Sequence, residues 1–326
     1  MNTETYIQIS EESLKSCKII HPPEILEEDK NIIKEYVNIV RDFTEIGQLF
    51  NIFLFNFEEL KSVFILKGDD KLQKIRYRKC NFDDLTIINS LTINYISSGV
   101  AFVKSLEAYL KNNMKNGEYD KFKVNCLSKK YDNCFSYRLF DFLRNFSQHC
   151  HLIVSCDNCG YCFDLNQLVN NPYYNYKKLI LNEMNDFIRE LLYSLGEYPR
   201  IAYSRTISEY KLCLSEIYLE FLNIINENLI EKYNEINKIL ENKPEIINKS
   251  VYSEFNDTII YEIKEDKVEL FKIGGNFFKF FYEIKKEVER EQEKDMKDFY
   301  NIDKFFKYSE KFPRLKDGKC IKMNNV

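Results

Sequence analysis

The residues best suited to chemistry are Arg144 and His149, which bound the six-residue segment RNFSQH. An imidazole has an ordinary pKa of about 6.5, so it can move a proton near neutral pH. A guanidinium is planar and permanently charged, so it can hold a phosphate and offset the charge of a transition state. The pair therefore combines a group that can move a proton with a permanent positive charge.

The spacing of Arg144 and His149 poses a geometric problem. Positions five apart on a regular helix point roughly 140° away from each other. Either the helix loosens near His149, or two copies of the chain face each other across a two-fold axis and both line one cleft. A competing interpretation is that Arg144 makes a surface ion pair with a residue such as Asp141 and that His149 only ends a helix.

A helix over 133–150 is expected to carry these residues, because its side chains separate into two stripes at the helical repeat. The apolar stripe holds Phe135, Leu139, Phe142, Phe146 and Cys150. The polar row beside it holds Arg138, Asp141, Asn145 and His149. Arg144 lies farther round, away from the apolar stripe.

A longer helix is expected upstream, over 81–117, with Asn81 as its N-cap and Asp84 three residues on. Its apolar positions follow helical spacing at Ile88, Leu91, Tyr95, Phe102, Leu106 and Tyr109. Small side chains gather at 97–99 (Ser-Ser-Gly), which costs helix propensity but lets another backbone approach. A helix crossing is therefore expected there.

The segment 137–149 resembles the final motif helix of HEPN-superfamily bundles, in which an Arg is followed by a polar residue and, after a short spacer, by a His. The stretch 88–98 resembles the long helix that precedes it in bacterial HEPN-like proteins. The resemblance extends over roughly residues 80–240.

This resemblance implies an all-α, up-and-down helical bundle that cleaves RNA without a metal, by attack of a 2'-hydroxyl on the adjacent phosphate. In that chemistry His149 is expected to move the proton and Arg144 to hold the phosphate. Asn145 is expected to orient the imidazole or to donate to the phosphate. The resemblance also implies a homodimer, no required cofactor, a toxin, stress or anti-phage defence role, and an antitoxin or regulator as a further partner. The leading alternative is a HEPN-fold interaction module without catalysis.

A second cluster with chemical potential is the CxxCxxC formed by Cys156, Cys159 and Cys162. It predicts either a zinc or iron–sulfur site, with a fourth ligand from 149–151, or a set of thiols in a turn. The HEPN relatives that the chain resembles have no such cluster. If His149 bound a metal, it could not also act as the base.

Candidate RNA contacts lie in a basic stretch ahead of the upstream helix, at Arg76, Arg78 and Lys79, and on the motif helix at Arg138. A solvated loop is the other interpretation of the basic stretch. Because the formal net charge of the chain is -4, any contact with RNA must be local.

Composition places the chain among globular proteins, since 44% of its 326 residues are hydrophobic and 30% are charged. Neither a signal peptide nor an apolar run of roughly 20 residues is apparent, so we expect a cytoplasmic protein without a membrane segment. In that compartment the 10 Cys are expected to be thiols or metal ligands rather than a disulfide framework.

Three regions are expected along the chain. Residues 1–80 hold a leader and helices, 81–243 the HEPN-like bundle, and 244–326 a hairpin and a charged helix. The hairpin is expected to pair Thr258–Lys264 with Lys267–Ile273, because both runs alternate around Glu265-Asp266.

Overall fold

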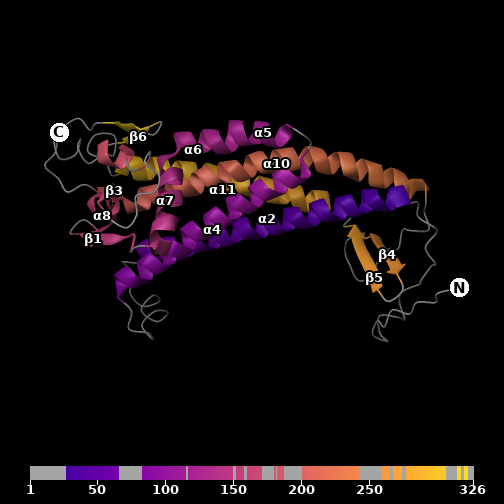
Figure 1. Ribbon diagram of the computed structural model, residues 1–326, viewed down its shortest axis with the longest axis horizontal. Coiled ribbons are helices and arrows are strands. Elements are labelled where there is room, and N and C mark those ends of the chain that lie inside the picture. Colours follow the sequence, from indigo (N-terminus) through magenta and orange to yellow (C-terminus); the bar gives the residue numbers. More distant parts are fainter. Residues whose placement is uncertain are drawn as a thin grey trace. The chain divides into compact units, whose positions relative to one another are not determined.

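The computed structural model describes residues 27–65, 83–114, 117–149, 152–157, 160–170, 180, 182–186, 200–242, 258–264, 267–273, 277–305, 314–316 and 319–321. Its residues fall into two compact units. Unit 1 comprises Met1–Glu45 and Phe221–Val288, and unit 2 comprises Ile46–Glu220 and Glu289–Val326. Helices dominate the described residues, and small antiparallel sheets accompany them, so the expected all-α fold with a small hairpin is confirmed (Figure 1).

Among the described residues of unit 2, four helical segments form a bundle. Its first is the second half of α2 (Glu27–Ile65), and its second is α4 (Asp84–Asn113). The third runs through α5 (Glu118–Phe122), the π-helical turn η3 (Lys123–Ser128), α6 (Lys129–Asn133) and α7 (Phe135–His149). The fourth is the first half of α10 (Tyr203–Asn242).

Contacts between these segments establish an up-and-down order. The Phe53 ring stacks on Tyr95 and the Phe50 ring contacts Phe102, so α2 and α4 run in opposite directions. Tyr95 Oη donates to the Ile207 carbonyl and Phe102 contacts Tyr218, so α4 and α10 run in the same direction. Segments that follow one another along the chain therefore alternate in direction, as in other up-and-down bundles.

Aromatic side chains fill the centre of this bundle. Phe53, Tyr95, Phe140 and Tyr210 are each 0% exposed, and each pair of their rings in contact has centroids 4.8–6.2 Å apart. Most of these pairs meet edge to face, which aromatic quadrupoles favour. The core thus ties α2, α4, α7 and α10 together.

The helix crossing expected at 97–99 is confirmed at Gly99. A Cβ placed there would lie 2.6 Å from Tyr210 Oη and 3.0 Å from a methyl carbon of Leu214. Only a residue without a side chain lets α10 pack this closely on α4.

The long upstream helix is also present, although its cap is not the expected residue. The Asp83 side chain accepts a hydrogen bond of 2.7 Å from the Thr86 amide, so Asp83 is the N-cap of α4. Hydrogen bonds from the amide and the hydroxyl of Thr86 lower the pKa of the Asp83 carboxyl. Asn81, the cap expected from the sequence, lies outside the described residues.

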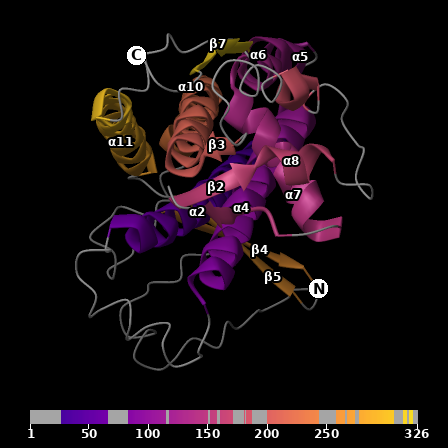
Figure 2. The same ribbon diagram turned by 90° about the vertical axis from the view of Figure 1, so that its left-hand side faces the viewer.

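Unit 2 also holds a small sheet that was not expected from the sequence. β1 (Ser155–Asp157), β2 (Gly160–Asp164) and β3 (Arg200–Ala202) pair antiparallel in that order, and α8 (Leu165–Val169) follows β2. Phe163 of β2 packs edge to face on Phe140 of α7. The sheet therefore lies at the same end of unit 2 as α7 (Figure 2).

Unit 1 contains the predicted hairpin, and β4 (Thr258–Lys264) and β5 (Lys267–Ile273) pair over the expected residues.

The helices of unit 1 contact one another through side chains. Lys232 Nζ of α10 forms an ion pair with Glu35 Oε2 of α2 at 2.9 Å. The Phe43 ring of α2 contacts the Phe281 ring of α11 (Phe277–Phe305). A last pair, β6 (Arg314–Lys316) and β7 (Lys319–Ile321), belongs to unit 2. The helices α2 and α10 each belong to both units. The boundaries expected at 80 and 243 lie outside the described residues.

Among the described helices, α4 is long and apolar enough to cross a bilayer by those two criteria. Half of its most apolar stretch is buried among protein side chains. A core helix of a bundle meets the same criteria.

Candidate functional site

The helix α7 positions the RNFSQH segment at the edge of the bundle. Its first residues, from Phe135 to Phe140, are all buried, and its second half is buried on one side only. The predicted apolar residues Phe135, Leu139, Phe142 and Phe146 are at most 3% exposed. This burial leaves Asp141, Arg144 and Asn145 half-buried along the other side.

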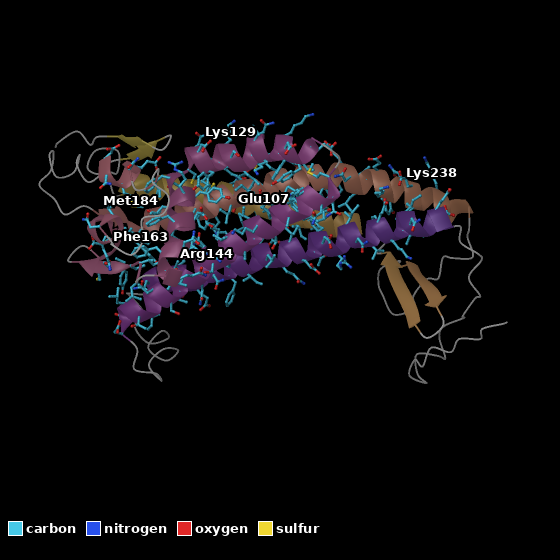
Figure 3. All side chains as sticks on the ribbon, in the orientation of Figure 1. Glu107, Lys129, Arg144, Phe163, Met184 and Lys238 are labelled. Carbon is cyan, nitrogen blue, oxygen red and sulfur yellow. The ribbon has the colours of Figure 1, made fainter. Side chains whose placement is uncertain are left out.

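Arg144 and Asn145 are joined directly, a contact that the sequence interpretation missed. Arg144, labelled in Figure 3, donates from Nη1 to Asn145 Oδ1 at 3.1 Å. Asn145 Nδ2 donates to the Asp141 carbonyl at 3.1 Å. Asn145 is thereby fixed to the preceding turn of α7 and holds the guanidinium by its oxygen. The expected contact of Asn145 with the His149 imidazole lies outside the described side chains.

No carboxylate among the described residues forms an ion pair with Arg144. The competing interpretation was a surface ion pair between Arg144 and Asp141. In the structure Arg144 instead donates a hydrogen bond to Asn145. A half-buried guanidinium with one neutral side-chain partner keeps most of its donors for another acceptor.

His149 is the last residue of α7, and its side chain lies outside the described part of the structure. The α-helix extends as far as His149. Both predicted catalytic residues thus belong to one helix, five positions apart.

Arg138 has a structural role rather than a place on the exposed polar row. Its side chain is 2% exposed, and Nη1 donates to the Tyr131 carbonyl at 2.6 Å and to that of Asp132. Nη2 also lies 3.1 Å from Glu183 Oε1. A guanidinium buried in this way cannot reach a phosphate, so the expected RNA contact at Arg138 is not supported. Burial raises the pKa of Glu183, while Arg138 opposes that change.

The strand register separates two of the three clustered cysteines. Ser155 pairs with Cys162 across β1 and β2, and Cys156 pairs with Tyr161. Because successive residues of a strand alternate between faces, Cys156 and Cys162 lie on opposite faces of the sheet. Cys162 is buried and Cys156 is exposed. The described residues hold no group of three His, Cys, Asp or Glu that fits a metal ion.

Four predicted site residues cannot be placed in this structure. Cys159, Arg76, Arg78 and Lys79 lie outside the described residues.

Asn89 is a buried polar residue that the sequence interpretation did not single out. Asn89 Oδ1 accepts from the amides of Ile153 and Val154 at 3.0 and 2.9 Å, and Nδ2 donates to the carbonyls of Val154 and Leu85 at 3.0 Å. It therefore fastens the segment that follows α7 to α4. A polar residue next to Ile88 in an apolar stripe was the signal that could have revealed it.

Comparison of the chain with models of protein families, with curated proteins and with solved structures gave no match.

Proposed function

We propose that the chain is an endoribonuclease that cuts RNA without a metal, by the HEPN-type chemistry that the RNFSQH segment implies. The observation that carries this proposal is the environment and the hydrogen bonding of the Arg144 guanidinium. Its guanidinium is half-buried, oriented by Asn145 and not paired with any described carboxylate. An oriented guanidinium with open donors suits a phosphate, which takes two parallel hydrogen bonds from it.

The proposed division of labour assigns one task to each residue. Arg144 binds the scissile phosphate and offsets its developing negative charge. His149 takes the proton from the 2'-hydroxyl or gives one to the leaving 5'-oxygen. Asn145 holds Arg144 in place and does not itself move a proton.

The proposed active form is a homodimer. Arg144 and His149 point roughly 140° apart on a regular helix, so one α7 does not converge them. Two copies of α7 across a two-fold axis bring Arg144 of one chain near His149 of the other. A toxin or phage-defence role follows from the same resemblance and belongs to this proposal.

The test is a cleavage assay on single-stranded and transfer RNA at neutral pH, with and without EDTA. We expect wild type to cut in both conditions and to leave 2',3'-cyclic ends. Arg144→Ala and His149→Ala should each lower the rate by about 100-fold or more, because each removes a group acting in the transition state.

Matched controls separate these effects from general damage. Arg41→Ala removes an exposed arginine whose ion pair is with the adjacent Asp42, and His21→Ala removes another of the three histidines. Both should cut as wild type does. If wild type leaves RNA intact, or all variants cut equally, the nuclease proposal fails and the non-catalytic interaction module is favoured.

A further inference from the structure

The part of α2 that belongs to unit 2 has two stripes of side chains at helical spacing, and one of them faces the core. The members of this inward stripe are at most 6% exposed, and they are Ile46, Phe50, Phe53, Phe57 and Leu60. An outward stripe follows the same kind of spacing at Gln48, Ile52, Phe55 and Glu59. At 100° per residue, its four members fall within roughly 60° of one another around the helix axis. The outward stripe is therefore one narrow face of α2, turned away from the core.

Two large apolar side chains lie exposed at the centre of the outward stripe. Ile52 is 51% exposed and Phe55 is 61% exposed. The other large apolar side chains that are exposed among the described residues stand apart from one another along the chain, and they are Val124, Leu152, Ile230, Tyr282 and Met296. Apolar residues at three- and four-residue spacing are the pattern by which one helix packs on another. The outward stripe thus suits a second helix.

The outward stripe also matches itself when it is reversed. From either end its residues are polar, apolar, apolar and polar, with steps of four, three and four residues. A two-fold axis level with positions 53 and 54 would place Ile52 opposite Phe55 of a second, antiparallel α2. The same axis would place Gln48 opposite Glu59 of the second copy, where the Gln48 amide can donate to the carboxylate. Each contact then occurs twice, as an isologous interface requires.

Charge favours this antiparallel arrangement over a parallel one. From Ile46 to Leu60, α2 has two carboxylates, Glu58 and Glu59, and no Lys or Arg. A parallel pair of helices would place Glu59 opposite Glu59 of the second copy, and like charges repel. The antiparallel pair instead places each Glu59 opposite a neutral hydrogen-bond donor.

We propose that the chain associates with a second copy of itself through the outward stripe of α2, with the two helices antiparallel about a two-fold axis. This inference does not rest on the proposed nuclease activity. The contact is distinct from the dimer proposed for catalysis, which uses α7. A chain that makes both contacts forms assemblies larger than a dimer.

The first experiment disrupts the apolar centre of the stripe in the full-length protein. Analytical ultracentrifugation over a range of concentrations gives the mass of the assembly and the Kd of association. Ile52→Arg and Phe55→Arg should each raise that Kd by about 100-fold, because each leaves a charge in an apolar contact. Where wild type is fully associated, either variant should have half the wild-type mass.

Val124→Arg is the matched control for these two variants. Val124 is also an exposed apolar residue, 63% exposed, but it belongs to η3 and not to the outward stripe. Its replacement should leave the mass and the Kd at their wild-type values. A mass that Phe55→Arg leaves unchanged, or that Val124→Arg lowers equally, would overturn the proposal.

A second experiment tests the register through Gln48, which is exposed. Gln48→Lys should lower the Kd by about 5-fold, because it places an ammonium opposite Glu59 twice in each pair. Gln48→Glu should raise the Kd by about 5-fold, because it places a carboxylate there instead. A parallel pair would place position 48 opposite itself, so both changes would raise the Kd. Any result other than opposite shifts contradicts the antiparallel register.

RNA cleavage separates this proposal from the proposed function. Phe55→Arg should lose self-association whether or not the protein cuts RNA. If the nuclease proposal holds, this variant should also cut at the wild-type rate per chain, because Phe55 lies on α2 and the proposed catalytic residues lie on α7. A wild type that is monomeric at every concentration would overturn self-association and leave the outward stripe to a partner of different sequence.

Discussion

At the scale of single residues, the bond between Asn145 and Arg144 is the most direct feature of the candidate site. Asn145→Ala removes the oxygen that receives Arg144 Nη1 at 3.1 Å. If Asn145 acts only by orienting Arg144, this change should lower the RNA-cleavage rate by about 10-fold, less than loss of the guanidinium itself. The measurement is the single-turnover rate at saturating RNA.

A double-mutant cycle makes that prediction specific. In an Arg144→Ala background, Asn145→Ala should have no further effect, because the group that Asn145 orients is already gone. Asn94→Ala, at an exposed position of α4, is the control and should cut at the wild-type rate. An Asn145 effect that persists without Arg144 would show that Asn145 has another role.

Tyr210 offers a second prediction, on stability. Its hydroxyl is buried and has no hydrogen-bond partner among the described residues, and burial raises its pKa well above the ordinary range. Removing an unpaired buried hydroxyl removes its desolvation cost, so Tyr210→Phe should leave the free energy of unfolding unchanged or raise it by about 1 kcal/mol.

Tyr95→Phe is the matched comparison, since Tyr95 Oη donates to the Ile207 carbonyl at 3.0 Å in the same aromatic core. That change should lower the free energy of unfolding by about 1 kcal/mol, because it removes a hydrogen bond within the buried core. Denaturant titration of both variants decides the matter. A larger loss for Tyr210→Phe than for Tyr95→Phe would mean that the Tyr210 hydroxyl is bonded in solution.

At the scale of elements, Asn89 links α4 to the segment after α7. Asn89→Ala would leave the buried amides of Ile153 and Val154 without the oxygen that receives them at 3.0 and 2.9 Å. We expect the free energy of unfolding to fall by about 3 kcal/mol, with the Ile153 and Val154 amides exchanging faster in hydrogen exchange. Asn94→Ala should change stability by less than about 0.5 kcal/mol.

The elements themselves were largely predictable, because hydrophobic spacing reports which face of a helix or strand is buried. The sequence predicted a helix at 133–150 and the structure has α7 at Phe135–His149, and β4 and β5 begin and end at the expected residues. The crossing at Gly99 was also predictable, since glycine allows close approach. The strands β1 and β3 were not, because runs of three residues carry little periodicity.

Partners distant along the chain explain the remaining errors. Arg138 falls on the polar row of a helical projection, but it is buried because Glu183 and the end of α6 supply acceptors. No local pattern contains that information. The ion pair of Lys130 with Glu216 has the same origin, since only the packing of α6 on α10 brings those side chains together.

At the scale of the whole molecule, the proposed homodimer makes a prediction that a single-chain site does not. Arg144→Ala and His149→Ala should each be inactive when pure. The two-fold axis gives the shared cleft two equivalent sites, each with Arg144 of one chain and His149 of the other. In a mixed dimer, one site has lost both groups and the other retains both. Random exchange of subunits makes about half of the dimers mixed, so the mixture should recover about one quarter of the wild-type activity.

The same mixture discriminates between the two geometric solutions to the spacing of Arg144 and His149. The alternative is that α7 loosens at its end, so that Arg144 and His149 of the same chain converge. Every site in the mixture then lacks either Arg144 or His149, and no activity returns. Subunit exchange must be verified, for example by co-purification of differently tagged variants after mixing. Recovery of activity with proven exchange therefore places Arg144 and His149 of one cleft on different chains, whereas proven exchange without recovery places them on the same chain.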